Sequence, residues 1–260
     1  GAAALRQVLA DSAGHISVLA FVRAIAEASA AVLITLVVVE EVEGSGEQQV
    51  LDVARAPGLG LGDRAVGLLA EPAAHQHVAE RERDQVLALF ANRSLSVLVA
   101  TDVAARGLDI EGLQLVLNVE LARDPEVHVH RIGRTGRAGE TGLAVSLVAP
   151  AEARRVQAIE ALQGQAAAWF PLAGLKTSLE PLLPPMHTLC IAAGRKDKLR
   201  PGDILGALTG NGAIAADKIG KISLFDHQAL VAVERALARQ ALEQLSNGRI
   251  KGRSLRVRQL

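Results

Sequence analysis

The sequence predicts an α/β protein in which a parallel sheet layered with helices is followed by a small α+β sandwich of βαββαβ order. Two observations support this class. In the middle of the chain, short apolar runs rich in Val and Leu alternate with helical patterns, and such alternation is typical of a parallel sheet. In residues 186–260 the expected order becomes strand, helix, strand, strand, helix, strand, which is the split βαβ arrangement of many RNA-binding domains. A chain of 260 residues has room for both domains.

The expected strands of the parallel sheet are bounded by Gly, Pro or charged residues, as strands buried on both faces often are. They are residues 96–104, 113–120 and 142–150. Helical patterns cover residues 81–94, 125–132 and 152–164. Residues 164–185 carry four prolines and no periodicity, so we expect a linker there.

The expected elements of the sandwich follow this linker. Its strands are residues 187–193, 219–225, 229–233 and 254–260, and its helices are residues 201–210 and 234–246. Together the patterns divide the chain into an atypical segment 1–76, a lobe 77–163, the linker 164–185 and a small domain 186–260.

Charge separates these parts, although the formal net charge of the chain is zero. Residues 186–260 hold 13 Lys and Arg against 6 Asp and Glu, a net charge of +7, and the preceding residues balance this with −7. A basic module attached to an acidic body favours a nucleic-acid partner.

Composition also limits the compartment and the cofactor class. The single cysteine, Cys190, excludes an intrachain disulfide and a Cys-based metal cluster. We expect a buried free thiol, no metal site and a cytoplasmic protein. The longest apolar run, residues 28–39, is too short to span a bilayer, so we expect no membrane segment.

The stretch HRIGRTGRAG carries three arginines, Arg131, Arg134 and Arg137, at a spacing of three, with a glycine two residues after each. At a helix start this spacing would cover neighbouring faces. Guanidinium groups match phosphate oxygens bidentately and keep their charge, and the glycines let a partner approach the backbone. The pattern predicts a phosphate site; the alternative is a set of surface arginines on a Gly-rich loop.

A second cluster follows the expected strand 96–104. Thr101, Asp102, Arg106 and Asp109 come at its carboxyl end, where open α/β sheets bind their ligands. Asp102 is equally well explained as a cap at the end of the strand.

These two stretches resemble the DEAD-box RNA helicases. TDVAARGLD is similar to motif V and HRIGRTGR to motif VI, and NVELARDPEVHVHRIGRTGRAG followed by the basic tail resembles the bacterial DbpA subgroup. The resemblance covers His77 to Leu260. It implies a RecA-like C-terminal helicase lobe followed by an RRM-like domain that recognises a hairpin of large-subunit ribosomal RNA, with a role in assembling that subunit.

In motif VI, the resemblance implies that Arg134 and Arg137 reach the γ-phosphate of ATP, and that His130 and Arg131 bridge the two helicase lobes. Arginine fingers of this kind contribute about 10³ to 10⁵ in rate.

In motif V, the resemblance places Gly107 and Asp109 near the nucleotide ribose, Arg106 at an interlobe contact and Thr101 on an RNA phosphate. Further upstream, Arg83 matches an RNA contact of the family, whereas Glu80 stands where the family has Gln.

Two departures from the family bear on activity. No lysine occurs before Lys176, so the first lobe's Gly-Lys-Thr phosphate loop is absent, and no Asp-Glu-Ala-Asp box occurs. We therefore expect ATP and Mg²⁺ to bind only together with a missing first lobe, and the chain alone to be inactive.

Residues 1–76 do not resemble the family. This segment is rich in Ala, Val and Gly and contains no lysine and a single aromatic residue, Phe21. Two interpretations are open: a wrong-frame or wrong-strand translation of a GC-rich gene, or a divergent start of the lobe.

The small domain lacks aromatic residues on its expected central strands, 187–193 and 229–233, so we expect no base stacking there. Basic loops are the expected RNA contacts instead. They supply Arg195, Lys196, Lys198 and Arg200, and then Arg249, Lys251, Arg253, Arg256 and Arg258. For Arg256 and Arg258 the alternative is an outward position on an edge strand.

These observations predict a fragment of an ATP-dependent RNA helicase that acts on structured ribosomal RNA. Two alternatives stay open. One is a non-enzymatic RNA-binding or ribosome-assembly factor, and the other is a defective truncated product.

Overall fold

A computed structural model describes residues 4–9, 35–39, 66–69, 76–101, 113–136, 142–171, 183–210 and 213–260. They belong to two compact units, Gly1–Arg83 with Ser96–Leu182, and Asp84–Leu95 with Leu183–Leu260. The second unit therefore contains the expected small domain together with a short segment that the sequence pattern assigned to the lobe.

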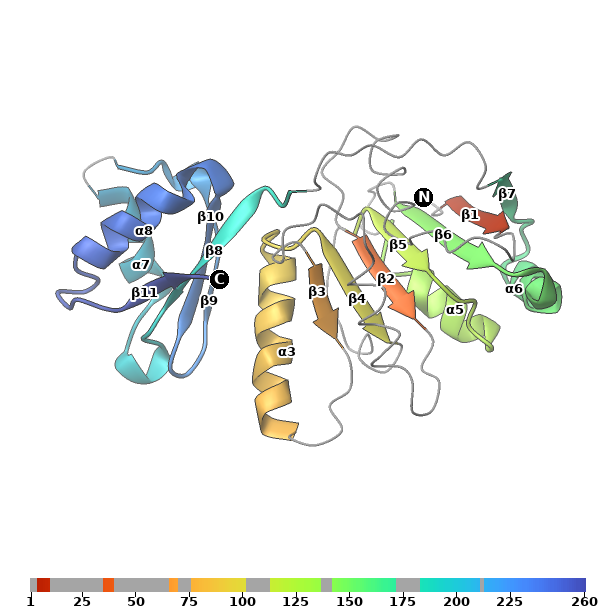
Figure 1. The fold of residues 1–260 in the computed structure, drawn as a ribbon, viewed down its shortest axis with the longest axis horizontal. Helices are drawn as coiled ribbons and strands as arrows, with labels where there is room; N and C mark the ends of the chain where they lie inside the picture. Colours follow the sequence, from red (N-terminus) through yellow and green to blue (C-terminus); the bar gives the residue numbers. More distant parts are fainter. Residues whose placement is uncertain are drawn as a thin grey trace. The chain divides into compact units, whose positions relative to one another are not determined.

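The first unit is built on a seven-stranded sheet of order β3-β4-β2-β5-β6-β1-β7 (Figure 1). All of its strand pairs are parallel, which confirms the α/β class. The strands are β1 Ala4–Leu9, β2 Thr35–Val39, β3 Val66–Leu69, β4 Val97–Thr101, β5 Leu115–Asn118, β6 Leu143–Val148 and β7 Ala168–Pro171.

The described residues of this part of the chain form three α-helices: α3 Gln76–Ala91, α5 Pro125–Ile132 and α6 Ala153–Gln163. Helices α5 and α6 belong to the first unit, whereas α3 passes from the first unit into the second at Asp84. Helix α6 ends where Gly164 adopts a left-handed conformation, φ 64°, and its N–H bonds to the Glu160 carbonyl, a common way for a helix to stop. Among the described helices, none is long and apolar enough to cross a membrane.

Strands β4 and β5 of this sheet are buried, as their unbroken apolar runs predict. Every residue of β5 is buried, and Val97, Leu98, Val99 and Ala100 of β4 have no exposed surface. The apolar runs were therefore identified correctly, and part of the expected strand 96–104 lies outside the described residues.

Two segments differ from the sequence expectation. Strand β7 lies inside the expected linker and pairs in parallel with β1. The linker prediction was wrong there because an edge strand tolerates a proline such as Pro171 at its end. Residues 1–76 contribute β1, β2 and β3 to the sheet. The origin of this segment stays a prediction for nucleotide sequencing to test.

The second unit contains the predicted βαββαβ order. Its elements are β8 Met186–Ile191, α7 Pro201–Thr209, β9 Ile219–Leu224, β10 Ala229–Glu234, α8 Ala238–Asn247 and β11 Val257–Gln259. The four-stranded sheet has the order β11-β8-β10-β9 and is antiparallel throughout. Both central strands, β8 and β10, therefore lie between paired neighbours.

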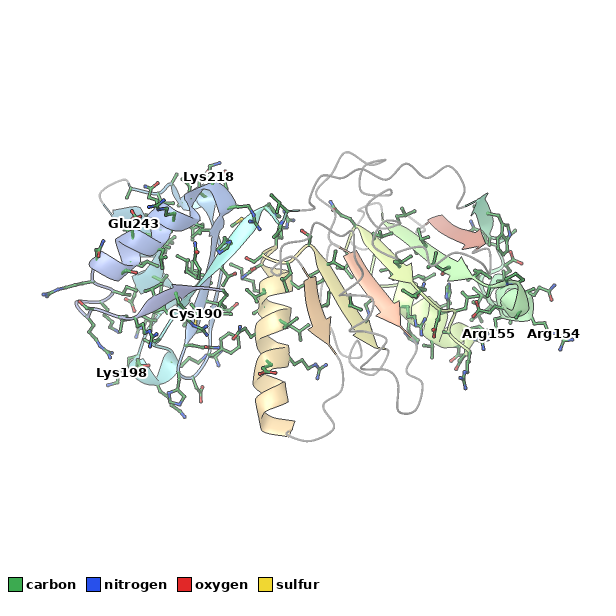
Figure 2. All side chains as sticks on the ribbon, in the orientation of Figure 1. Arg154, Arg155, Cys190, Lys198, Lys218 and Glu243 are labelled. Carbon is green, nitrogen blue, oxygen red and sulfur yellow. The ribbon has the colours of Figure 1, made fainter. Side chains whose placement is uncertain are left out.

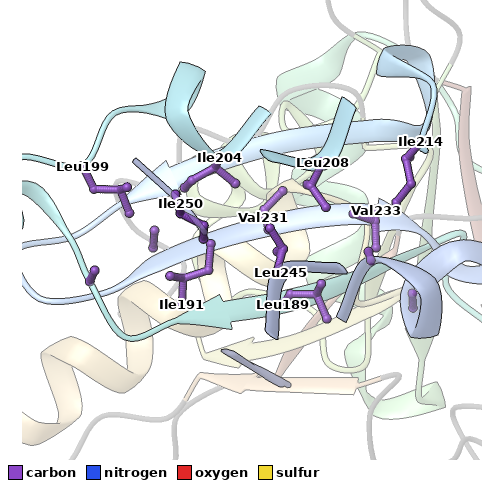
Figure 3. Packing of buried hydrophobic residues seen from close by; sticks show 14 residues of the cluster. Leu189, Ile191, Leu199, Ile204, Leu208, Ile214, Val231, Val233, Leu245 and Ile250 are labelled. Atoms are coloured by element: carbon purple, nitrogen blue, oxygen red, sulfur yellow. The ribbon is translucent and has the colours of Figure 1, made fainter. Parts of the chain in front are cut away.

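One face of this sheet packs against α7 and α8 around a single core (Figure 3). The sheet contributes alternate residues of β8 and β10, and the helices contribute residues three or four positions apart, as each period requires. The core includes Leu189, Ile191, Val231, Val233, Ile204, Leu208, Ala241 and Leu245.

Candidate functional site

Helix α5 carries the start of the arginine-rich stretch. Its N-cap is Asp124, whose side chain accepts a 2.9 Å hydrogen bond from the Glu126 N–H, and Pro125 is the first helical residue. It ends at Ile132, and Gly133 is the C-cap. Arg131 therefore lies in the last turn of the helix, and Arg134 follows its C-cap. The expectation of a helix start was wrong, because the Asp-Pro cap begins the helix before the arginines.

The predicted motif VI side chains differ in their exposure. His130 is exposed and Arg134 is half-buried, whereas Arg131 keeps 5% of its surface exposed. The Arg131 guanidinium donates hydrogen bonds to the Glu120 carbonyl at 2.8 Å and to Oδ1 of Asn118 at 3.5 Å. Arg131 is thus held inside its own unit, while the other two side chains reach the surface.

The turn after α5 brings the motif VI stretch to the segment that follows motif V. The Thr135 hydroxyl donates a hydrogen bond to the Leu113 carbonyl, and the two residues form an isolated parallel bridge. Both are buried. Arg134, just before Thr135, therefore sits on a turn whose far end is fixed.

Several predicted site residues lie outside what the structure describes. These are Arg106, Gly107, Asp109 and Arg137. Thr101 is the last residue of β4, and Arg83 is exposed on α3. The functional roles of all six stay predictions.

His128 is a buried titratable group one turn before Arg131. It has no exposed surface, and neither ring nitrogen has a hydrogen-bond partner among the described residues. Burial, followed by the nearby charge of Arg131, lowers the pKa of His128 from 6.5 to about 4. His128 is therefore neutral at pH 7 and adds no charge next to the arginines.

In the second unit, the two predicted basic loops lie next to each other. The first contains the 3-10 turn η2, Arg195–Asp197, followed by Lys198; Figure 2 labels Lys198. The Lys251 ammonium of the second loop donates a 2.6 Å hydrogen bond to the Lys198 carbonyl. Lys198 and Lys251 both have positive φ, 59° and 53°, which is uncommon for residues with a side chain. These two loops, 195–200 and 249–253, are called the basic loops below.

Ion pairs hold part of this surface in place. Arg253 lies 3.7 Å from a carboxylate oxygen of Asp197, and Lys251 lies 3.8 Å from Asp203. Lys196 lies 3.3 Å from Asp226 of the β9–β10 connection. Other cations are exposed and form no ion pair with a residue that the structure describes. They are Arg195, Lys198, Arg200, Arg249, Arg256 and Arg258.

The sheet face opposite the core is also buried in the second unit. Thr188, Cys190, Leu230 and Ala232 are at most 5% exposed. Thr188 accepts a 2.8 Å hydrogen bond from Asn92, and its hydroxyl lies 2.7 Å from that of Ser94. This face presents no aromatic platform for bases, so the basic loops are the better candidate for RNA contact.

Sequence reasoning missed the buried polar partners of motif VI. Asn118 on β5 donates a 3.0 Å hydrogen bond to Ser146 on β6, opposite it in register. Each is a polar residue in an otherwise apolar run, a signal that could have marked them. Thr135 lies inside the motif itself but was given no role.

Comparison with known proteins agrees with both parts of this description. Residues 71–139 match the helicase conserved C-terminal domain, and residues 188–259 match the DbpA RNA binding domain. The crystal structure of the Escherichia coli DEAD-box protein SrmB bound to regulator of ribonuclease activity A has a similar fold. That likeness has a TM-score of 0.53 at 24% identity and covers 70% of this chain and 98% of that chain.

Two relatives carry the name ATP-dependent RNA helicase DbpA. The protein of Escherichia coli (strain K12) is 53% identical over 187 residues, which are 72% of this chain and 40% of that protein. The protein of Bacillus subtilis (strain 168) is 35% identical over 204 residues, 70% of this chain and 43% of that protein. The chain therefore spans about two fifths of the length of these relatives. With a helicase C-terminal domain followed by a DbpA RNA-binding domain, it belongs to the DbpA group of the DEAD-box RNA helicase family.

Proposed function

We propose that this chain supplies the second lobe and the RNA-binding domain of an ATP-dependent RNA helicase. The observation that carries the proposal is the place of Arg134 in a segment that matches the helicase C-terminal domain. Its side chain is half-buried on a turn between a buried arginine and a buried threonine. A positioned guanidinium that reaches the surface suits a phosphate supplied by another lobe.

In this proposal Arg134, with Arg137, approaches the γ-phosphate of ATP. Guanidinium groups stabilise the charge that spreads over the phosphoryl oxygens in the transition state, which accounts for about 10³ to 10⁵ in the rate of related enzymes. The half-buried side chain of Arg134 fits such an anion, because partial burial strengthens the electrostatic interaction. His130, exposed on the same helix end, is proposed to contact the first lobe.

ATP and Mg²⁺ are proposed to bind only when that first lobe is present. The family resemblance assigns the phosphate loop and the carboxylates for magnesium to the first lobe. Among the residues that the structure describes, no group of three or more His, Cys, Asp or Glu could hold a metal ion. ATP turnover by the chain alone is therefore not part of the proposal.

The basic loops are proposed to bind a structured RNA, a hairpin of the large-subunit ribosomal RNA, during assembly of that subunit. The exposed cations of these loops suit phosphate groups. The opposite sheet face is buried and lacks aromatic residues on β8 and β10, which argues against binding by single-strand stacking. We therefore propose that the basic loops recognise the shape and the phosphate backbone of a folded RNA hairpin.

A second candidate is a non-enzymatic RNA-binding factor that acts in ribosome assembly. It is favoured by one observation: the basic loops are complete within the chain, whereas Arg134 needs a nucleotide held elsewhere. Both candidates place the protein in the cytoplasm, where a buried free thiol such as Cys190 is stable. Fractionation of cells that express the tagged chain tests this placement, and a membrane-bound pool would contradict it.

Complementation of ATP hydrolysis separates the two candidates. The first lobe of the Escherichia coli relative is fused in front of the chain, and RNA-stimulated ATP hydrolysis is measured with and without the Arg134→Ala change. We expect turnover by the fusion, none by the chain alone, and a loss of kcat of at least about 10³-fold for Arg134→Ala.

The control is Arg154→Ala, which removes an exposed arginine on α6 of the same unit (Figure 2). A fusion without turnover, although folded and able to bind RNA, would favour the non-enzymatic factor. Equal losses from Arg134→Ala and Arg154→Ala would show that Arg134 acts only as surface charge.

A further inference from the structure

Arg134 lies on a short turn that is attached to the lobe at both ends. Its own N–H bonds to the Arg131 carbonyl at 3.2 Å, and the Thr135 N–H bonds to the Ile132 carbonyl at 3.1 Å. These local bonds fix the shape of the turn. They do not fix where the turn sits on the sheet, which depends on the side chains of Arg131 and Thr135.

The first attachment is the buried Arg131 side chain. Its guanidinium bonds to the Glu120 carbonyl just beyond β5 and reaches Oδ1 of Asn118, the last residue of that strand. Asn118 is in turn fixed by its hydrogen bond to Ser146 on β6. Asn118 and Ser146 have no exposed surface, so water cannot replace these bonds.

The second attachment is Thr135, one residue after Arg134. Its buried hydroxyl bonds to the Leu113 carbonyl, and the backbones of the two residues form a parallel bridge. Thr135 also lies against Gly142, just before β6. A Cβ atom at Gly142 would overlap the Thr135 hydroxyl and the Gly136 nitrogen and would lie 2.9 Å from the Thr135 Cβ. Only glycine leaves room for the turn in this position.

We propose that Arg131 and Thr135 are positioning residues that hold Arg134 in place from either side, with Asn118 and Gly142 supporting them. The inference rests on the proposed function, because it assigns the phosphate contact to Arg134. It gives Arg131 a different part from the interlobe contact that the family resemblance implies. Its guanidinium is bound within the lobe, and it acts through Arg134.

Such anchoring matters because the Arg134 guanidinium must be positioned precisely. A displacement of about 1 Å at a reacting group can lower a rate about 100-fold. An arginine has a long side chain with many rotamers, so a fixed backbone limits the positions that its guanidinium can take. Two attachments on opposite sides of one residue limit both the translation and the tilting of the turn.

The anchoring is tested first on the full chain without nucleotide, by hydrogen–deuterium exchange read by mass spectrometry. Thr135→Val removes the hydroxyl and keeps the shape, and Thr135→Ser restores the hydroxyl. For Thr135→Val we expect exchange of residues 133–136 to become roughly 5- to 10-fold faster, the effect of losing one hydrogen bond. Thr135→Ser should return most of the protection.

The matched control is Thr209→Val on α7. It removes another threonine hydroxyl bound to a backbone carbonyl, that of Leu205 at 2.9 Å, and should leave residues 133–136 unchanged. Gly142→Ala is a second, independent perturbation and should also speed exchange there. Unchanged exchange at residues 133–136 in both Thr135→Val and Gly142→Ala would overturn the proposal, whatever the ATPase results show.

The consequence for chemistry is tested in the fusion with the first lobe of the Escherichia coli relative. We expect Thr135→Val to lower kcat about 10- to 100-fold while KM for ATP changes little, because the turn matters most in the transition state. Thr135→Ser should restore most of kcat. Faster exchange with normal kcat in Thr135→Val would overturn the positioning role. A wild-type fusion without turnover would overturn the proposed function. The anchoring of the turn by Thr135 would then be decided by the hydrogen–deuterium exchange experiment alone.

Discussion

Neutralising two arginines of the first basic loop should weaken RNA binding in a salt-dependent way. The change is Arg195→Gln together with Arg200→Gln in the full chain. Both side chains are exposed, and neither forms an ion pair with a described residue. The backbone of Arg200, whose N–H bonds to Asp203, is unaffected by the change. The fold should therefore survive, and the effect should be one of charge.

The size of the effect follows from the number of cations that are free to bind phosphate. Each phosphate contact contributes about 0.7 to 0.9 to the slope of log affinity against log salt. If all six exposed and unpaired cations contact phosphates, the wild-type slope is about 4 to 5. Losing two contacts should lower this slope by about 1.4 to 1.8, so the affinity ratio of wild type to variant should shrink about 7- to 12-fold between 50 and 200 mM salt.

The assay is fluorescence anisotropy with a labelled hairpin of large-subunit ribosomal RNA, titrated at four salt concentrations. The control is Arg154→Gln with Arg239→Gln, which lowers the net charge equally but changes one arginine on α6 and one that pairs with Glu243 on α8. It should keep the wild-type slope. Equal slopes for the two double variants would refute the assignment of the RNA contact to the basic loops, and tighter binding to poly-uridine than to the hairpin would refute hairpin recognition.

Two further predictions concern stability. The pKa of His128 is lowered from 6.5 to about 4. Between pH 6.5 and pH 4, His128 therefore binds a proton in the unfolded chain but stays neutral in the folded chain. The free energy of unfolding should therefore fall by about 3 kcal/mol as the pH falls from 7 to 4. Urea unfolding of His128→Leu should show a pH dependence that is smaller by this amount. The same pH dependence in the variant and the wild type would contradict the burial argument. Ile204→Ala, in the core drawn in Figure 3, should lower the unfolding free energy of the second unit by about 2 to 5 kcal/mol. The neighbouring Leu205→Ala, 37% exposed, should change it far less, and similar losses would be inconsistent with the packing.

The sequence was informative where one physical pattern decides the structure. Unbroken Val and Leu runs identified β4, β5 and β6, because a parallel strand covered on both faces has no polar side to alternate with. The βαββαβ order of the small domain could be read from its changing periodicity. The expected linker was less secure, since prolines mark an edge strand such as β7 as readily as a loop.

The motif identifies the arginines of the candidate site, whose roles stay predictions, but it does not reveal the contacts between them. A motif shows which arginines occur, but guanidinium groups at a spacing of three look alike in a sequence. The structure distinguishes them by burial: Arg131 is enclosed and hydrogen-bonded, whereas Arg134 reaches the surface. That difference depends on Asn118 and Ser146, which are 28 positions apart in the chain and meet only when two strands pair in register.

Those buried polar residues explain how the charged side chain of Arg131 on α5 is buried against the carboxyl end of β5. An arginine buried against strands of Val and Leu would lose several kcal/mol of hydration if it had no polar partners. The amide oxygen of Asn118 accepts a hydrogen bond from the guanidinium, and its amide N–H donates one to Ser146, so hydrogen bonds connect Arg131 through the last residue of β5 to β6. Replacing Asn118 with leucine would keep the apolar run intact and leave Arg131 without this acceptor. The most hydrophobic version of the strand is therefore not the one that accommodates a buried arginine, and the polar residue in the apolar pattern marks the position where Arg131 is bound.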